Sequence, residues 1–396
     1  MNLKSKLNQL QTQAGSRNAS AVLSDQHKRL KIPRRVGRQE SPSNSSKTPE
    51  TALAKRLQGK LIDNGLIVIR KQIPLSSRLG RIKLNTLQPH PKLPGDDEEY
   101  RLTNVYIDTE TTGLSGGSGT LAFLIGFAWL EASSIQLTQL LITRFSSEPE
   151  MLYQFENALQ ADQRLVSYNG KSYDLPLLIS RYRMQSQTQQ LDQLPHLDLL
   201  HPTRRLFRKS WPDCRLTSLE NRLLGFRRLD DLPGSEAPAA WFDYLQRGRC
   251  ENLIKVVDHN RSDIVSLVAA HTQLANAIEN PEKYRTDLFG LARWMAEHDS
   301  FRACTILMDR RSRLDEQSKR LLAILLQKNG DRRSANTLWK ELADSGCPYA
   351  IERLAKYHEH ISKDISAAHY YCLQLPESYA RTHRLHRLNR KAEISR

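Results

Sequence analysis

The segment that most constrains this chain is residues 105–114, which read VYIDTETTGL. β-Branched and aromatic residues favour a strand, and successive side chains of a strand point to opposite faces. Asp108 and Glu110 are therefore expected on one face of the strand, with Thr109 on the other. Two neighbouring carboxylates repel each other unless a cation lies between them, and hard oxygen ligands suit Mg²⁺ or Mn²⁺. A solvated strand end is the alternative, and this short motif alone does not decide between the two.

A second motif lies in residues 164–178, which read RLVSYNGKSYDLPLL. Residues 165–168 are typical of a short buried strand, and the Asn-Gly pair that follows is typical of a turn. Ser172 is the expected N-cap of the next helix. Asp174 then falls in the first helical turn, beside exposed backbone N–H groups.

A third motif lies in residues 256–268, which read VVDHNRSDIVSLV. Its apolar residues recur at helical spacing and predict an amphipathic helix. His259 and Asp263 are four residues apart and therefore share one face of that helix. Such a pair, taken alone, is more often found on a solvated surface. Together with the other carboxylates, it predicts the fourth corner of a metal site.

The order of these three acidic motifs resembles that of the DEDD exonuclease superfamily, and more closely that of the YprB-type predicted exonucleases. The resemblance extends to residues 211–225, Arg228, Asp230, 233–234 and Pro238, and to the lead-in residues 65–70, 74–75 and 79–80. It covers roughly residues 55–275. The three motifs are specific as a set and weak one by one.

The resemblance implies an α/β fold with an RNase H-like mixed five-stranded sheet and flanking helices. The sequence agrees with this topology: residues 105–108, 122–130 and 137–144 are expected to form three antiparallel strands, followed by a helix and a parallel strand at 165–168. Residues 65–87 are expected to form short strands that precede this domain. The domain is expected to span residues 51–280.

The resemblance also implies a metal-dependent 3′–5′ exonuclease, which hydrolyses the phosphodiester bonds of single-stranded nucleic acid. Its metal ligands would be the carboxylates of Asp108, Glu110, Asp174 and Asp263. They would hold two divalent ions, Mg²⁺ or Mn²⁺. In such two-metal sites, one ion lowers the pKa of a bound water and the other stabilises the leaving oxygen.

His259 departs from the family pattern. In one branch of the superfamily a tyrosine precedes the last aspartate by four residues, and in the other a histidine precedes it by five. Here a histidine has the tyrosine spacing, and Asp258 occupies the other position. One helical turn before Asp263, the imidazole of His259 can still reach an attacking water, so we expect it to act as the general base or to orient the water.

The charge of the chain agrees with a nucleic-acid partner, because the formal net charge is +16. A basic stretch at residues 204–211 ends in Trp211, for which core packing is the alternative to base stacking. Glu220, in the helix that follows, is interpreted as structural. The residues expected to contact DNA or RNA are Thr111, Asn169, Lys171, Arg204, Arg205 and Arg208.

Residues 1–50 are expected to form a disordered basic arm, because residues 1–47 hold ten basic and two acidic residues and few apolar ones. The arm would add phosphate contacts, unless it is only a solvated tail or a mitochondrial presequence. There is no apolar run of eighteen residues and no secretory h-region, and the five cysteines lie far apart without a CxxC pair. We therefore expect a cytoplasmic protein without membrane spans, zinc or disulfides.

Residues 281–396 are expected to form an all-α helical-repeat domain. The segments 318–343 and 348–375 each read as a helix, a short polar turn and a second helix that opens with alanine. This approximate period resembles tetratricopeptide repeats, which bind a partner protein or buttress their neighbour. The basic run at 381–391 is either a phosphate-contacting tail or a solvated helix face.

Two other functions stay open at this point. One is a non-catalytic nucleic-acid-binding adaptor in which the carboxylates are relics, although a relic site tends to lose a ligand and all four acids are present. The other is a structure-specific endonuclease that uses the same metals. The sequence does not distinguish DNA from RNA, because a contact to the 2′-hydroxyl leaves no motif.

Overall fold

The computed structural model describes residues 48–62, 65–96, 102–113 and 119–394. Residues 1–46 form one unit of the chain and residues 47–396 another, and only the second is described below. Residues 1–47 of the basic arm expected at 1–50 therefore lie outside the described residues.

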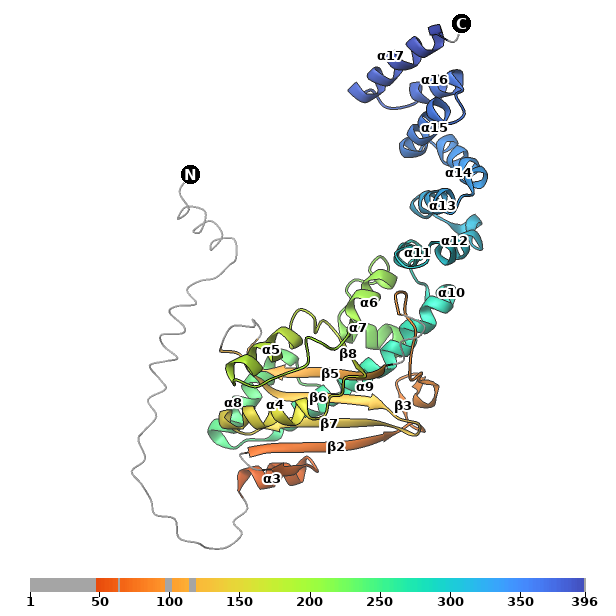
Figure 1. The fold of residues 1–396 in the computed structure, drawn as a ribbon. Coiled ribbons are helices and arrows are strands. Elements are labelled where there is room, and N and C mark those ends of the chain that lie inside the picture. Colours follow the sequence, from red (N-terminus) through yellow and green to blue (C-terminus); the bar gives the residue numbers. More distant parts are fainter. Residues whose placement is uncertain (1–47, 63–64, 97–101, 114–118, 395–396) are drawn as a thin grey trace, which may run out of the picture. The chain divides into compact units, whose positions relative to one another are not determined.

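A mixed sheet forms the centre of the region before residue 280 (Figure 1). Its seven strands are β1 (Lys60–Ile62), β2 (Leu66–Pro74), β5 (Thr103–Thr111), β6 (Ala122–Leu130), β7 (Ser134–Ile142), β8 (Gln163–Ser167) and β9 (His196–Asp198). They lie in the order β1-β2-β7-β6-β5-β8-β9. β5 pairs antiparallel with β6 and parallel with β8, and β8 pairs parallel with β9. A separate hairpin consists of β3 (Arg78–Leu79) and β4 (Ile82–Lys83).

This sheet confirms the predicted fold class, but the predicted number of five strands is wrong. β2 does not merely precede the sheet: it pairs antiparallel with β7 along its whole length, from Leu66 to Pro74, and β1 adds a further strand beside it. At the other edge, β9 has only three residues. So short a segment carries no alternating pattern that sequence reasoning could detect.

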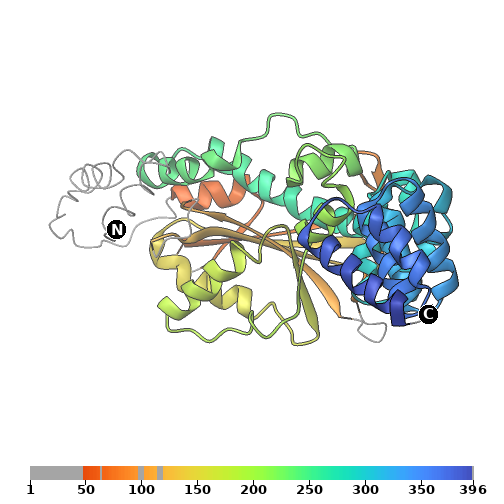
Figure 2. The ribbon, with the colours of Figure 1, turned by 90° about the horizontal axis from the view of Figure 1, so that it is seen from above.

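Helices cover both faces of the sheet (Figure 2). On one face lies α9 (Glu251–Glu279), and the Tyr106 hydroxyl lies 3.1 Å from His271 Nδ1 on this helix. On the other face lie α4 (Glu148–Glu156) and α5 (Asp174–Met184), which share a core with Val105 and Ile107. β5 therefore alternates as its sequence predicts, with its even-numbered side chains towards α9.

A glycine lets α9 approach the sheet closely at the position of Asp108. Gly126 of β6 is the antiparallel partner of Asp108. A Cβ atom at Gly126 would lie 2.1 Å from Oδ1 of Asn260 on α9, so no larger residue fits without moving the helix.

Four further helices complete this region: α3 (Pro49–Arg56), α6 (Leu200–Phe207), α7 (Leu216–Leu219) and α8 (Ala237–Arg247). The indole of Trp241 fixes α8 to the sheet. It is buried, stacks on Phe123 with a centroid distance of 5.3 Å, and donates a 2.8 Å hydrogen bond to the carbonyl of Ile142. Trp211 stacks on Phe207 at 4.2 Å and packs against the core, as its core-packing interpretation predicts.

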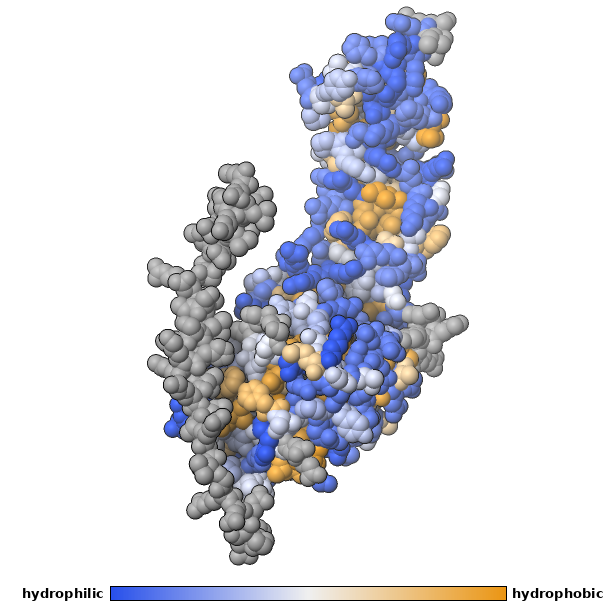
Figure 3. Space-filling model, turned by 60° about the vertical axis from the view of Figure 1, so that its left-hand side comes forward, coloured by the Kyte–Doolittle hydropathy of each residue, from blue (hydrophilic) through white to orange (hydrophobic). Residues whose placement is uncertain are grey.

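The region after residue 280 is helical. Its helices are α10 (Pro281–Tyr284), α11 (Leu288–Ala296), α12 (Ser300–Met308), α13 (Glu316–Lys328), α14 (Arg332–Asp344), α15 (Pro348–His360), α16 (Ile365–Leu373) and α17 (Tyr379–Ile394). Aspartate N-caps start five of them. Asp299, Asp315, Asp331 and Asp364 each accept a backbone N–H three residues ahead, and Asp287 accepts that of Phe289. The face seen in Figure 3 is mostly hydrophilic. Among the described residues, no helix is both long enough and apolar enough to cross a membrane.

The basic run at 381–391 contributes to packing instead of forming a free tail. Glu359 of α15 is buried and accepts hydrogen bonds from Arg384 (3.1 Å), Arg387 (2.6 Å) and Lys391 (2.8 Å) of α17. The hydrogen bond from Arg387 is the main cause that lowers the pKa of Glu359 to about 2. These ion pairs attach α17 to α15.

Candidate active site

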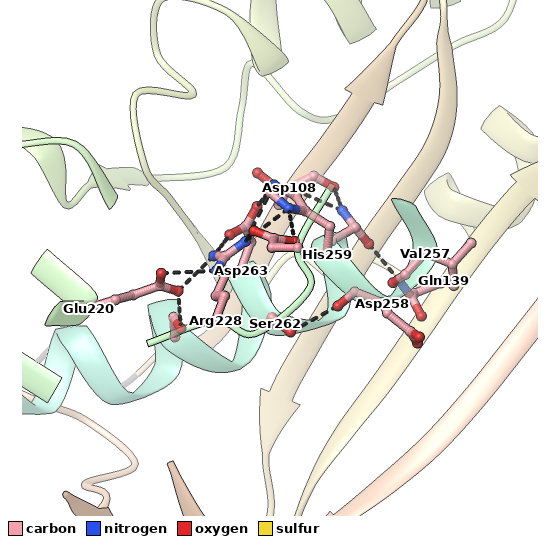
Figure 4. A network of polar contacts seen from close by, with 12 residues as sticks. Asp108, Gln139, Glu220, Arg228, Val257, Asp258, His259, Ser262 and Asp263 are labelled. Carbon is pink, nitrogen blue, oxygen red and sulfur yellow. Dashed lines mark hydrogen bonds and ion pairs between the residues drawn. The ribbon is translucent and has the colours of Figure 1, made fainter. Parts of the chain in front are cut away.

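The two carboxylates of β5 lie where α9 crosses the sheet. Asp108 Oδ2 accepts a 2.8 Å hydrogen bond from the side-chain amide of Asn260, which also donates to the Asp108 backbone carbonyl at 3.1 Å. The Asn260 oxygen accepts in turn from Nε2 of Gln139, at 2.7 Å (Figure 4). Both amides are fully buried, so they hold Asp108 in one orientation.

Asp174 reaches the site from the opposite face of β5. Its Oδ1 accepts a 2.5 Å hydrogen bond from the hydroxyl of Thr109, whose side chain points away from α9 as the strand alternation predicts. Asp174 is the first residue of α5. The predicted N-cap is wrong: Tyr173 occupies that position without a side-chain hydrogen bond, and Ser172 is exposed.

A buried carboxylate on β9 holds the turn that precedes α5. Asp198 accepts the backbone N–H groups of Asn169 (2.7 Å), Lys171 (3.1 Å) and Leu200 (3.0 Å). It thereby fixes the turn between β8 and α5, in which Asn169 has the left-handed φ of 69°. Asp198 is a positioning residue that the sequence motifs did not indicate.

The long helix α9 brings the third motif into the same place. Glu110, His259 and Asp263 each offer one ligand atom, and these atoms all lie within 4.8 Å of one another. His259 Nε2 is 3.3 Å from Asp263 Oδ2, and His259 Nδ1 is 2.7 Å from Asp231 Oδ1. The structure therefore brings together the residues that the sequence places on one strand and one helix.

The carboxylates lie close enough to disfavour one another's ionisation. Burial, and then the charges of the other three carboxylates, raise the pKa of Asp108 well above its ordinary value. Burial also raises the pKa of Glu110 to about 8 and that of Asp174 to about 6, although the Thr109 hydrogen bond opposes the rise at Asp174. Buried carboxylates that repel one another in this way are a donor set that fits a divalent cation.

An arginine that sequence reasoning did not assign to the site lies within this cluster. Arg228 is hydrogen-bonded to Asp263, and it donates to Glu220 at 2.7 and 3.0 Å (Figure 4). Its Nη1 lies 3.3 Å from Oδ2 of Asp231. Glu220, interpreted as structural, is thus the anchor of a cation in the site, and Ser266 of α9 donates to it at 2.6 Å.

The same network sets the protonation of His259. Burial lowers the pKa of His259, but the hydrogen bonds to Asp263 and Asp231 outweigh this effect and raise the pKa to about 9. The imidazole is therefore charged at neutral pH when no metal is bound. Arg228 opposes that charge, because both groups are cations.

The residues predicted to contact nucleic acid lie in two places. The Thr111 hydroxyl donates to the carbonyl of Gly113 at the end of β5, and Lys171 is exposed beside the turn that leads to Asp174. Arg204 and Arg205 lie on α6 and Arg208 directly follows it. Arg205 forms a 2.8 Å ion pair with Glu297, which directly follows α11. None of these three arginines forms an ion pair with the four carboxylates within the part of the chain that the structure describes.

Comparisons with known proteins show what this chain is similar to. Residues 105–275, which include all four carboxylates, match the family model of the RNase H superfamily. The protein YprB of Bacillus subtilis (strain 168) is 31% identical over 282 residues, which are 68% of each chain. The family B DNA polymerase of Pyrobaculum calidifontis gives a TM-score of 0.36 at 13% identity, over 51% of this chain and 29% of that one. The chain belongs to the RNase H superfamily and, within it, to the family of YprB.

Proposed function

We propose that this chain is a metal-dependent 3′–5′ exonuclease that hydrolyses the phosphodiester bonds of single-stranded nucleic acid. The convergence of four buried or half-buried carboxylates, Asp108, Glu110, Asp174 and Asp263, carries the proposal. Membership of the RNase H superfamily supports nuclease chemistry. The order and spacing of the acidic motifs, which resemble those of the DEDD exonucleases, support attack from the 3′ end.

The protein holds its metal ligands in place before any ion binds. Asn260 fixes Asp108, Thr109 fixes Asp174, and Arg228 holds Asp263. Divalent ions bound by these carboxylates, Mg²⁺ or Mn²⁺, would supply the positive charge that activates water and stabilises the leaving oxygen. Ligands that are already oriented lose less freedom on binding, which favours a defined metal geometry.

His259 is the proposed proton acceptor of the reaction. Its Nε2 faces the carboxylate cluster and would take the proton of the attacking water, while Nδ1 donates to Asp231. Asp231 fixes the ring orientation and stabilises the imidazolium once it has formed. A base must be neutral to accept a proton, so this role requires that the pKa of His259 falls when the negative charge of Asp263 is neutralised.

The substrate would approach beside Arg228 and Asp231. A cavity of about 490 Å³, lined by Glu220, Arg228 and Asp231 among others, lies there. Thr111 and Lys171 lie on the segments that follow Glu110 and precede Asp174, where they could contact the phosphates next to the cleaved bond. Arg228 would contribute further positive charge there.

The test is a cleavage assay with matched carboxylate variants. Single-stranded DNA and RNA, labelled at the 5′ end, are incubated with the purified protein in Mg²⁺, Mn²⁺ or EDTA, beside Asp108→Asn and Asp192→Asn. Asp192 is exposed and outside the site, so its variant controls for the loss of one negative charge. We expect a metal-dependent ladder from the wild type and the control, but not from Asp108→Asn. Internal cuts would indicate an endonuclease, and binding of both polymers without any cut would indicate an adaptor.

A further inference from the structure

A basic cavity lies between α6 of the sheet domain and α11 of the C-terminal helices. Its volume is about 510 Å³. Five basic and two acidic side chains line it, so its local charge is positive. α6 supplies Arg204 and Arg205 and is followed directly by Arg208 and Lys209, while Arg293 comes from α11.

Three of these cations are free to bind a ligand. Arg204, Arg208 and Arg293 are exposed and form no ion pair with any described carboxylate. The two acidic residues of the cavity form ion pairs with its other two cations: Glu297 pairs with Arg205 at 2.8 Å, and Asp287 lies 3.5 Å from Lys209. Phosphates suit such a site, because guanidinium groups bind phosphate oxygens in pairs.

The cavity also presents aromatic rings beside its cations. Lys209 Nζ lies 4.7 Å from the ring centroid of Phe289, which is half-buried, and Arg205 lies 5.3 Å from that of Trp294. Sites for single-stranded nucleic acid combine a positive groove with rings on which bases stack. An acidic peptide would use the positive charges but would have no base to place on Phe289.

The walls of the cavity are held rigidly against each other. The backbone N–H of Asp287 donates to the carbonyl of Leu206 at 2.8 Å. A Cβ atom at Gly290 would lie 2.1 Å from the carbonyl oxygen of Arg205, so the glycine allows the two helices to touch. Leu206 and Leu291 are fully buried in one core beneath them.

One carboxylate connects the cavity to the candidate active site. Asp198 accepts from the N–H of Leu200, the first residue of α6, and from the N–H groups of the turn that leads to Asp174. α6 has eight residues and is therefore about 12 Å long. Arg204 and Arg208 lie four and eight residues after Leu200, so they are about one and two helical turns from the residue that Asp198 holds.

We propose that this cavity binds the phosphate backbone of the nucleic-acid strand whose end is cleaved, so that α11 forms part of the substrate site. The inference rests on the proposed function for the identity of the strand. It gives α11 a role in substrate binding, in addition to the partner-binding or buttressing role that a repeat pattern implies.

The experiment measures binding in EDTA, where no cleavage takes place. Fluorescein-labelled single-stranded DNA and RNA oligonucleotides are titrated with the full chain at several salt concentrations. The test variant is Arg204→Gln/Arg208→Gln/Arg293→Gln. The control variant is Arg332→Gln/Arg333→Gln/Arg390→Gln, which removes the same charge from α14 and α17. These three arginines are exposed and form no ion pair with a described residue.

We expect the Kd of the test variant to rise at least about tenfold, since each charged hydrogen bond contributes about that factor or more. The slope of log K against log salt should become shallower by about 2, because each lost phosphate contact on a single strand removes about 0.7. The control variant should bind like the wild type. Phe289→Ala should weaken binding without changing the slope, since stacking is not ionic.

Equal weakening of the test and control variants would overturn the inference, and so would unchanged oligonucleotide binding by the test variant. If that variant also loses affinity for a poly-glutamate peptide, the cavity binds an acidic peptide instead. The outcome is separable from the proposed function. Cleavage by the wild type with normal binding by the test variant would overturn only the inference. Cavity-dependent binding without any cleavage would support the inference and contradict the exonuclease.

Discussion

The guanidinium of Arg228 donates two hydrogen bonds to the carboxylate of Glu220, over 2.7 and 3.0 Å, and their side chains are 9% and 2% exposed. Nη2 of Arg228, which donates to Glu220, also donates a hydrogen bond to Asp263. Burial lowers the pKa of Arg228, but the carboxylates outweigh it, so the guanidinium stays charged. Glu220 therefore fixes a permanent positive charge beside one carboxylate of the site.

Breaking this pair from either side should destabilise the protein. Arg228→Ala leaves Glu220 buried without its cationic partner, which costs about 3–5 kcal/mol of unfolding free energy. Glu220→Ala should cost less, because Arg228 keeps its ion pairs with Asp231 and Asp263. The double variant should cost less than the sum of the two. Urea denaturation in EDTA measures the cycle, and the exposed pair Glu352–Lys356 serves as a control expected below about 1 kcal/mol. Strict additivity of Arg228→Ala and Glu220→Ala would contradict the coupling.

Asp108→Asn should separate stability from metal binding. The substitution keeps an oxygen that accepts from Asn260 but removes a charge that the other carboxylates repel. In EDTA, its melting temperature should equal or exceed that of the wild type. Mn²⁺ should raise the melting temperature of the wild type much more than that of the variant. A variant that is destabilised in EDTA and still responds fully to Mn²⁺ would refute this account of the cluster.

Without metal, the stability of the protein should fall as pH rises from about 5 to 9. The pKa of Glu110 is raised to about 8 and that of His259 to about 9, so the folded state binds more protons than the unfolded state in this range. The stabilisation by protonated His259 is complete below its unfolded pKa and is lost as pH rises through about 9. Mn²⁺ should weaken the trend, because its affinity grows as the carboxylates ionise. Chemical denaturation at a series of pH values tests this, and stability that rises with pH in EDTA would contradict it.

His259→Gln should slow catalysis by about 10²–10⁴-fold while the response of the melting temperature to Mn²⁺ persists. Asp231→Asn should leave more activity than His259→Gln does, but it should move the acid limb of the pH–rate profile to lower pH. The reason is that the hydrogen bond that His259 donates to Asp231 raises the pKa of His259. An unmoved acid limb would show that another group accepts the proton.

The sequence allowed prediction of the parts of the site that lie on regular elements. Strand alternation placed Asp108 and Thr109 on opposite faces, and the helical repeat of four placed His259 beside Asp263. Both relations depend on local periodicity alone. The central strands β5 to β8 were also predictable from local sequence, because each contains a run of apolar residues that is buried in the sheet.

The missed residues depend on tertiary contacts. Arg228 lies on an irregular loop, and only the folded chain brings it to Glu220 and Asp263. Asp198 is the last residue of a three-residue strand, which is too short to show a sequence pattern. Asn260 did leave a signal: it is a polar residue at helical spacing between Val257 and Ile264, on the apolar face of its helix.

The polarity of digestion tests the central claim most directly. One oligonucleotide is prepared in three forms, labelled at its 3′ end, labelled at its 5′ end, or closed into a circle, and each is incubated with wild type and Glu110→Gln in Mn²⁺. We predict that the wild type releases labelled mononucleotide from the 3′-labelled form at the earliest times, shortens the 5′-labelled form stepwise and leaves the circle intact. Glu110→Gln should do none of this. Opening of the circle, release from the 5′ end first, or full activity of Glu110→Gln would contradict the account.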